Sequence, residues 1–255
     1  MNVISYSLYG DSEKYLKGIL ENATTCKKLL PNWQVRVYCG LEIPKEVICE
    51  LEILGCHVYL EEEFWHKNGM FWRYLPLGEE GIDYLIFRDA DSRITMRDIQ
   101  ALNEWVESGK IVHFVRDHPF HQAPILGGLW GIKNSKIETT NFWKLAKEYS
   151  SRFGEDQRFL ANHVYPYTRK HSFSHDHYFA YEKKCRNLVN QSENYMGESF
   201  DENDNIDIKL REIKSLVDKS PRARLVLKVR SFIQSKFLLC KSYFVSKRAL
   251  TIPKR

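Results

Sequence analysis

A short apolar run at residues 84–87 ends in two closely spaced carboxylates that could hold a cation. The run, Tyr-Leu-Ile-Phe, is aromatic and β-branched, which is typical of a strand buried in a sheet. Asp89 and Asp91 follow it two residues apart, and in extended chain both side chains project to the same side. They repel each other unless a positive charge lies between them, and Mn²⁺ or Mg²⁺ prefers such hard oxygen ligands. We therefore predict a divalent-metal site at the end of this strand.

A cluster of salt bridges is the plainer interpretation of the same stretch. Arg88 and Arg93 flank the two aspartates and could neutralise them without a metal. A bare Asp-x-Asp motif is short and common, so it does not separate the two interpretations. Its position after a buried strand favours the metal site, because open α/β sheets bind ligands at the carboxyl ends of their strands.

Predicted strands and helices alternate around this stretch. Apolar, β-branched runs predict strands at residues 3–8, 35–39, 56–60, 84–87 and 111–115. Apolar residues at helical spacing predict a helix after most of these strands. The helix after the aspartates has a capping-box pattern at Thr95 and Asp98 and ends near Gly109. This alternation predicts an α/β fold with a mostly parallel, Rossmann-type sheet flanked by helices.

The net charge differs sharply between the two ends of the chain. The whole chain carries +5, but 11 lysines and arginines and no acidic residue lie between Lys219 and Arg255, which leaves −6 on residues 1–218. Apolar residues in the basic segment recur at the spacing of one helix face, at positions 226, 229, 233, 237, 240 and 244. We predict a main domain over residues 1–205, and a linker with a basic amphipathic helical tail over residues 206–255.

Such a tail indicates an anionic partner, and basic amphipathic helices often lie on anionic membranes. No nucleic-acid reader motif accompanies the charge, so we expect a membrane surface or a partner protein and no nucleic acid. The sequence has no apolar run long enough to span a bilayer and no signal-peptide pattern. The expected location is the cytoplasm, with the tail holding the protein peripherally on the inner face of the membrane.

Several common sites are absent from the sequence. The first predicted strand is followed by neither a dinucleotide-binding glycine motif nor a P-loop, and there is no Gly-x-Ser-x-Gly elbow. The six cysteines are scattered without a Cys-x-x-Cys pair, so we expect reduced packing residues rather than disulfides.

Other residues are candidates for binding an anionic substrate. Arg73 precedes the predicted strand at residues 84–87, and it could give a phosphate a bidentate contact or form a buried structural pair. Gly127 and Gly128 belong to a glycine-rich stretch where backbone approaches something closely. Trp130 offers an apolar face to a sugar ring, or packs in the core.

The order of these motifs resembles a known enzyme class. Arg73, the strand ending in Asp89-Ala90-Asp91, Glu155-Asp156-Gln157 and His175-Asp176 follow one another as in GT-A nucleotide-sugar glycosyltransferases. The resemblance is closest to the glycogenin and bacterial lipopolysaccharide galactosyltransferase group. Two further segments, Arg116-Asp117-His118-Pro119 and Met196-Gly197-Glu198, are similar to segments of bacterial capsule and surface-polysaccharide transferases. The resemblance covers roughly residues 1–205.

The resemblance implies a metal-dependent, hexosyltransferase-type enzyme with a GT-A-like catalytic domain. It would move a sugar from a nucleotide-diphosphate sugar to a glycan or lipid-linked acceptor in surface-polysaccharide synthesis, with retention of anomeric configuration. By the same resemblance, the metal ligands are Asp89, Asp91 and His175, and the catalytic residues are Asp156 and Gln157. The substrate-binding residues expected on this basis are Tyr9, Arg73, Arg88, Gly127, Gly128 and Trp130.

Two other functions are compatible with the same residues. A non-catalytic GT-A-like scaffold could dock on the membrane through its tail. A metal-dependent phosphohydrolase or nuclease could use Asp89 and Asp91, but it would normally need more clustered acidic residues than this strand has nearby. Asp156 could serve only as a favourable charge at a helix N-terminus, and His175 only as a loop residue beside His171 and His177.

Overall fold

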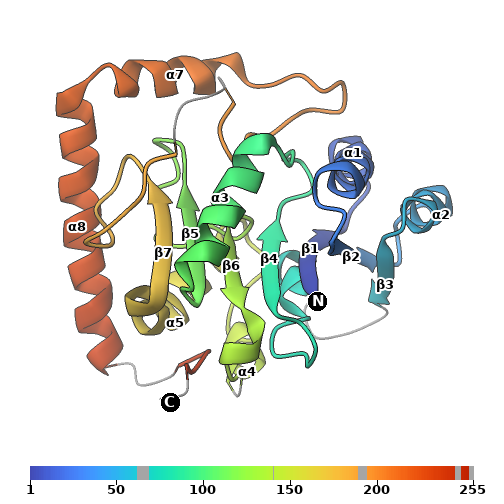
Figure 1. The fold of residues 1–255 in the computed structure, drawn as a ribbon, viewed down its shortest axis with the longest axis horizontal. Coiled ribbons are helices and arrows are strands. Elements are labelled where there is room, and N and C mark those ends of the chain that lie inside the picture. Colours follow the sequence, from blue (N-terminus) through green and yellow to red (C-terminus); the bar gives the residue numbers. More distant parts are fainter. Residues whose placement is uncertain (62–68, 140, 189–193, 245–247, 253–255) are drawn as a thin grey trace.

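The computed structural model describes residues 1–61, 69–139, 141–188, 194–244 and 248–252 of the chain (Figure 1). Its centre is one seven-stranded sheet in the order β3-β2-β1-β4-β6-β5-β7. The strands are β1 (Asn2–Leu8), β2 (Trp33–Gly40), β3 (His57–Glu61), β4 (Tyr84–Arg88), β5 (Val112–Arg116), β6 (Trp130–Lys133) and β7 (Ser172–Asp176). Only β6 runs antiparallel to its neighbours among these strands, so the predicted α/β fold with a mostly parallel sheet is confirmed.

Helices cover both faces of the sheet. The helices are α1 (Glu13–Leu29), α2 (Lys45–Ile53), α3 (Met96–Ser108), α4 (Phe142–Ala146), α5 (Glu155–His163), α6 (Tyr165–Thr168), α7 (Ile208–Asp218) and α8 (Pro221–Phe244). Helices α1, α2 and α3 contribute to one apolar core cluster, and α4, α5 and α6 to the other. The short 3₁₀ helix η1 (Gly69–Tyr74) joins the second cluster. The fold is therefore a three-layer arrangement, because each face of the sheet buries its own core.

The capping signals around α3 form as predicted. The side chain of Asp98 accepts from the backbone N of Thr95 at 3.0 Å, and the helix ends at Gly109, whose φ is 66°. That backbone region favours glycine, so Gly109 can stop the helix without strain. Since α3 begins just after Asp89 and Asp91, this well-defined start fixes the chain beyond the two aspartates.

Two helices make up most of the C-terminal part of the chain. Residues 208–218 form α7, and α8 runs beside the β7 edge of the sheet (Figure 1). Leu227 and Leu238 of α8 pack on the core, and the chain then returns to bury Ala249 and Leu250 in that core. Within the described residues, no helix combines the length and the apolar composition that crossing a membrane requires.

Candidate active site

A cavity of 320 Å³ lies at the carboxyl ends of β1 and β4. Strand order reverses between these two strands, because β2 and β3 lie on one side of β1 while β4 and the later strands lie on the other. Ligands of open α/β sheets bind at such a switch point. The cavity is lined by Ser7, Tyr9, Tyr15, Met70, Arg73, Asp89, Ala90, Asp91, Gly127, Phe153, Gly154, Asp156, Gln157, Gly197 and Ser199.

Arg73 lies at the base of this cavity between two carboxylates. Its guanidinium forms an ion pair with Asp89 and a second one with Asp156, at 3.7 Å from Nη2 to Oδ2. Its Nε donates to the carbonyl oxygen of Met70 at 2.9 Å, and this hydrogen bond fixes the orientation of the guanidinium group. Burial alone would lower the pKa of Arg73, but the charges of Asp89 and Asp156 outweigh it and raise that pKa. Arg73 therefore stays charged and positions two acidic side chains.

Asp91 pairs with a different cation. Its Oδ2 lies 2.6 Å from Nζ of Lys14, which comes from the first turn of α1 and also donates to Ser199 at 3.0 Å. The sequence-based alternative had assigned the neutralisation of the two aspartates to Arg88 and Arg93. That assignment was wrong: Arg88 pairs with Asp98 on α3, and Arg93 pairs with Asp204.

Gly127, which lines the cavity, and the adjacent Gly128 leave room for these carboxylates. A methyl group added at Gly127 would lie 2.0 Å from Oδ2 of Asp156, and one added at Gly128 would lie 2.1 Å from Oδ2 of Asp89. Real Cβ atoms do not approach other atoms this closely, so a larger residue at either position would have to displace the carboxylate. The predicted close approach of backbone at this stretch therefore exists, and its partners are the carboxylates.

Asp156 opens α5 and is held more tightly than Asp89. Its Oδ1 accepts from the backbone N of Gln157 at 2.8 Å, and the Tyr74 hydroxyl lies 3.5 Å from its Oδ2. Burial raises the pKa of Asp156, although the nearby Arg73 opposes that shift. The carboxylate is therefore buried, oriented and close to a cavity, which suits a group that meets a reacting sugar.

The donor set at the cavity fits a hard divalent cation. The side chain of Asp89 is 46% exposed, that of Asp91 is 15% exposed, and the hydroxyl-bearing Ser7 and Ser199 line the same cavity. Magnesium-like ions are often held by one or two carboxylates together with substrate phosphates, which leaves the remaining positions to the ligand. A cation bound here would share Asp91 with Lys14 or displace its ammonium group.

Four predicted site residues do not line the cavity. Gly128 lies against Asp89, and the other three lie elsewhere in the fold. Trp130 is fully buried in the core, with its ring centroid 4.5 Å from that of Phe87. Arg88 is buried and forms its ion pair with α3. His175 lies in β7, where its two ring nitrogens contact His113 at 2.8 Å and Glu104 at 3.2 Å. The structure does not bring His175 to Asp89 and Asp91, and none of the three enters our proposal.

The buried His113–His175 pair should make the fold sensitive to acid. Burial, together with the neighbouring positive groups, holds the pKa of His113 well below its ordinary value. In the unfolded chain His113 binds a proton below about pH 6.5, so stability should fall as the pH drops through that value. Because the pKa of His113 is lowered in the folded protein, urea unfolding of the wild type should show a free energy of unfolding that decreases below about pH 6.5.

A His113→Gln variant should lose less stability over the same pH interval, because glutamine does not titrate. His57→Gln is the matched control, since His57 is exposed at the start of β3. If the variant shows the same loss on acidification as the wild type, His113 does not cause the acid sensitivity.

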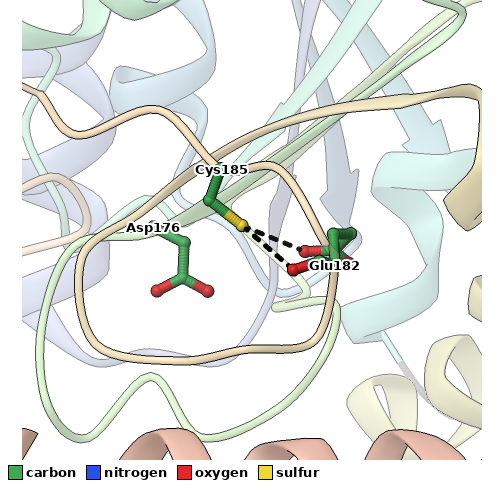
Figure 2. Close-up of side chains that lie close together, drawn as sticks. All are labelled: Asp176, Glu182 and Cys185. Atoms are coloured by element: carbon green, nitrogen blue, oxygen red, sulfur yellow. Dashed lines mark hydrogen bonds between the residues drawn. The ribbon is translucent and has the colours of Figure 1, made fainter.

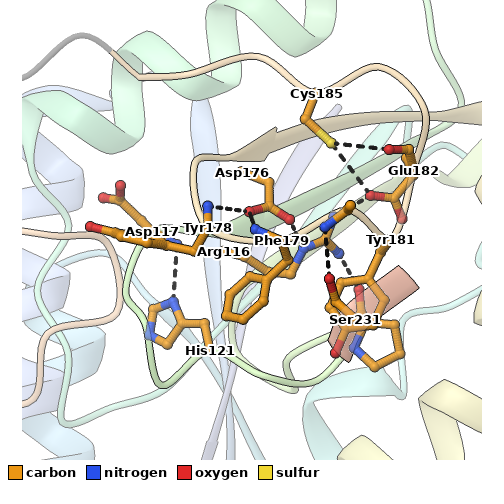
Figure 3. A network of polar contacts seen from close by, with 12 residues as sticks. Arg116, Asp117, His121, Asp176, Tyr178, Phe179, Tyr181, Glu182, Cys185 and Ser231 are labelled. Carbon is orange, nitrogen blue, oxygen red and sulfur yellow. Dashed lines mark hydrogen bonds and ion pairs between the residues drawn. The ribbon is translucent and has the colours of Figure 1, made fainter. Parts of the chain in front are cut away.

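Asp176, Glu182 and Cys185 form another cluster of metal-ligand types, the only group of at least three within 4.8 Å in the described part of the chain (Figure 2). Arg116 already neutralises it. Its Nε lies 2.5 Å from Oδ2 of Asp176, and its Nη2 pairs with Glu182 (Figure 3). Burial raises the pKa of Cys185 to about 12, so its sulfur stays a thiol. Thiols are poor metal ligands, and we interpret the cluster as a structural network.

Several cavity residues escaped the sequence analysis. Tyr15 of α1 lines the cavity, and its neighbour Lys14 contacts Asp91. Gly197 and Ser199 line it from the segment before α7. The backbone of Ser199 pairs with that of Ser92, which places the late segment beside the strand end. A local pattern could not reveal these residues, because only long-range pairing brings them to the aspartates.

Comparisons with known proteins give only remote likenesses. No family model matches the chain, and no curated protein matches it. Its structure is similar to that of S. aureus TarS 1–349 in complex with UDP, at 11% identity and a TM-score of 0.47, over 64% of this chain and 54% of that one. It is also similar to glucosyl-3-phosphoglycerate synthase from Mycobacterium tuberculosis in complex with Mn²⁺, UDP-glucose and phosphoglyceric acid, at 10% identity and a TM-score of 0.43, over 68% of this chain and 69% of that one.

A third similar structure is the mannosyltransferase PcManGT from Pyrobaculum calidifontis in complex with GDP-Man and Mn²⁺. The identity is 12% and the TM-score 0.40, over 63% of this chain and 51% of that one. The chain spans about half the length of TarS 1–349 and of this mannosyltransferase. Likenesses at this level carry no argument about substrate, and the specific resemblance to the glycogenin and galactosyltransferase group stays a prediction.

Proposed function

We propose that this protein is a metal-dependent glycosyltransferase that uses a nucleotide-diphosphate sugar. One observation carries the proposal: Asp89, Asp91 and Asp156 meet in a single cavity at the switch point of the sheet, with Arg73 between two of them. Asp89 and Asp91 would hold Mn²⁺ or Mg²⁺. When bound, the ion would neutralise the diphosphate charge that develops as the bond to the sugar breaks.

The protein's own residues have separate roles in this proposal. Arg73 holds Asp89 and Asp156 in place and adds positive charge beneath the diphosphate. The glycine backbone at 127–128 lets the donor sugar lie against the carboxylates, and Tyr9, half-exposed at the rim, offers it an apolar face. Asp156 would accept a hydrogen bond from the transferred sugar or act as base or nucleophile, with Gln157 beside it.

The finer parts of the function are also proposals. The acceptor would be a glycan or a lipid-linked sugar in surface-polysaccharide synthesis, and the transfer would be of hexosyl type with retention. The burial of Asp156 supports a group acting directly at the sugar. A metal-dependent phosphohydrolase remains the second candidate, and it would release inorganic phosphate or nucleotide without an acceptor.

A thermal-shift screen tests the proposal. The protein is heated with Mn²⁺ or Mg²⁺, alone and with each of a panel of nucleoside diphosphates and their sugar derivatives. A ligand that binds only the folded state at 100 times its Kd stabilises it by about 2.7 kcal/mol, which raises the melting temperature. We expect one nucleotide to stabilise the protein only when metal is present. If no nucleotide does so with either metal, the proposal fails, whereas release of phosphate from the ligands would favour the phosphohydrolase.

Alanine substitutions at the two glycines should separate binding from transfer. Gly128→Ala displaces Asp89 and should weaken metal-dependent nucleotide binding by about 10–100-fold. Gly127→Ala displaces Asp156 and should lower transfer by about 10²-fold, with a much smaller change in nucleotide affinity. Calorimetry and a transfer assay measure the two effects.

Gly131→Ala is the control for this pair. A methyl group there meets Ile86 and Trp105 in the core and touches neither carboxylate. This variant should lower the melting temperature, but it should not selectively weaken either nucleotide binding or sugar transfer. Equal effects of Gly127→Ala and Gly128→Ala on nucleotide affinity would contradict the division of roles.

A further inference from the structure

Helix α8 presents most of its large apolar side chains to solvent, although Leu227 and Leu238 pack on the protein. Six of them are 49–69% exposed: Leu225, Val226, Val229, Phe232, Ile233 and Phe237. We call these six residues the outward face of α8. At 3.6 residues per turn they cover an arc of about 140°, which is the width of a helix face that normally lies against a core.

The opposite side of α8 is polar where it meets the catalytic domain. Ser231 and Ser235 are only 2% and 3% exposed. The Ser231 hydroxyl accepts from the backbone N of Ala180 at 2.8 Å, and Gln234 accepts from the Tyr181 hydroxyl at 2.7 Å. The helix is therefore fixed to the domain by hydrogen bonds and by Leu227 and Leu238, with its apolar side turned outward. A surface helix in water ordinarily has the reverse arrangement.

An apolar groove continues the outward face. A space of 460 Å³ lies between α8 and the segment after β7, lined mainly by Phe179, Tyr181, Leu227, Ile233 and Phe237. Ile233 and Phe237 belong to both the groove and the outward face, so the two form one apolar surface.

Basic side chains lie both beside this surface and within it, and Nζ of Lys236 lies 5.2 Å from the ring centroid of Phe232. Arg222, Lys228, Arg230, Lys236 and Lys241 are all exposed on α8, and the sequence from 219 to 255 has no acidic residue. If a second copy of the chain bound here, the basic side chains of the two copies would repel each other, which disfavours self-association through this face. Anionic headgroups above hydrocarbon complement both the charge and the apolar face.

We propose that α8 lies in the interface of an anionic bilayer, with its outward face inserted and its basic residues among the headgroups. Because the helix is bonded to the catalytic domain through its inner side, the bilayer would hold the whole domain in one orientation. A helix joined to the domain only by a flexible linker would not impose any orientation. This inference is independent of the proposed enzymatic function.

Vesicle sedimentation tests it with the full chain. An outward variant carries Val226→Ser, Val229→Ser and Phe232→Ser, none of which lines the groove. Its control carries Leu41→Ser, Ile53→Ser and Leu60→Ser, which are also 51–80% exposed but lie far from α8 in the sequence. Wild type and control should sediment with vesicles containing phosphatidylglycerol, and the outward variant should bind at least about tenfold more weakly.

The charge contribution is tested by Lys228→Gln, Arg230→Gln and Lys236→Gln together. Each basic residue near an anionic surface changes binding by roughly fivefold, so this variant should lose most of its preference for phosphatidylglycerol over pure phosphatidylcholine vesicles. Added salt should weaken the wild type in the same way. Thermal stability and nucleotide binding should stay unchanged in all three variants.

Two results would overturn the proposal. The wild type could fail to sediment with anionic vesicles at low salt, or the outward variant could bind them as well as the wild type does. The alternative is that a second copy of the chain covers this face, and sedimentation velocity tests it. If the wild type dimerises and the outward variant does not, the face belongs to a dimer interface. Because nucleotide binding is measured on the same samples, failure of the membrane contact and failure of the enzymatic proposal remain separate.

Discussion

An Asp91→Asn variant should no longer bind a nucleoside diphosphate in a metal-dependent way, and sugar transfer should fall by about 10²–10³-fold. The substitution keeps the shape of the side chain but removes the charge that we assign to the metal. Lys14 would also lose its partner, 2.6 Å away, without any clash. Calorimetric titration of nucleotide, with Mn²⁺ and with chelator, measures the binding.

Asp204→Asn is the matched control for this loss. Asp204 is another aspartate in an ion pair with a basic side chain, Arg93, but it is exposed and does not line the cavity. Its backbone φ of 60° suits asparagine as well as aspartate. The control should bind nucleotide like the wild type, with both variants melting close to it. Undiminished nucleotide binding by Asp91→Asn would remove Asp91 from the site.

An Arg73→Ala variant should be destabilised by about 3 kcal/mol or more, because it leaves a buried carboxylate without its cation. Asp156 carries most of this cost, since its side chain is 7% exposed while that of Asp89 is 46% exposed. The sequence left open whether Arg73 contacts a phosphate or forms a buried structural pair. The buried position of Arg73 now predicts both the loss of stability and a loss of donor use. Urea unfolding measures the first, and nucleotide titration measures the second.

The pH dependence of this deficit identifies its cause. Without Arg73, the pKa of Asp156 rises further above its unfolded value, since burial already raises it. The folded variant then binds more protons than the unfolded chain, so its stability increases as the pH falls. The deficit should shrink between neutral and mildly acidic pH, and an added Asp156→Asn substitution should recover part of it.

Arg36→Ala provides the comparison. Arg36 is also a buried arginine in an ion pair, but its partner Glu79 is 45% exposed and can be solvated alone. That variant should lose clearly less stability and should show no recovery in acid. Equal losses in the two variants would mean that an uncompensated buried carboxylate is not the cause.

The sequence predicted the strands whose signal is local. The first five strands are short apolar runs, and β1 to β5 form where these runs lie. It did not predict β6 or β7. The four residues of β6 are stabilised by antiparallel pairing with β4 and β5, and β7 by pairing with β5. Such partners are distant in sequence, so the strands show little periodicity of their own.

The same distinction applies to the candidate site. Asp89, Asp91 and the two glycines could be recognised because each follows from a local pattern. The direction in which a side chain points depends on its distant neighbours. Trp130 points into the core, and His175 points toward Glu104 on α3. Lys14 could not be recognised because nothing in α1 indicates its contact with an aspartate 77 positions later.

Anomalous diffraction at the manganese edge tests the central claim most directly. Crystals would be grown with Mn²⁺ and the nucleoside diphosphate found by the thermal-shift screen. Our account predicts one strong peak at about 2.0–2.6 Å from carboxylate oxygens of Asp89 and Asp91, with diphosphate oxygens on the same ion. A diphosphate bound without a peak at these aspartates, or a peak at Asp176, Glu182 and Cys185 in its place, would contradict the account.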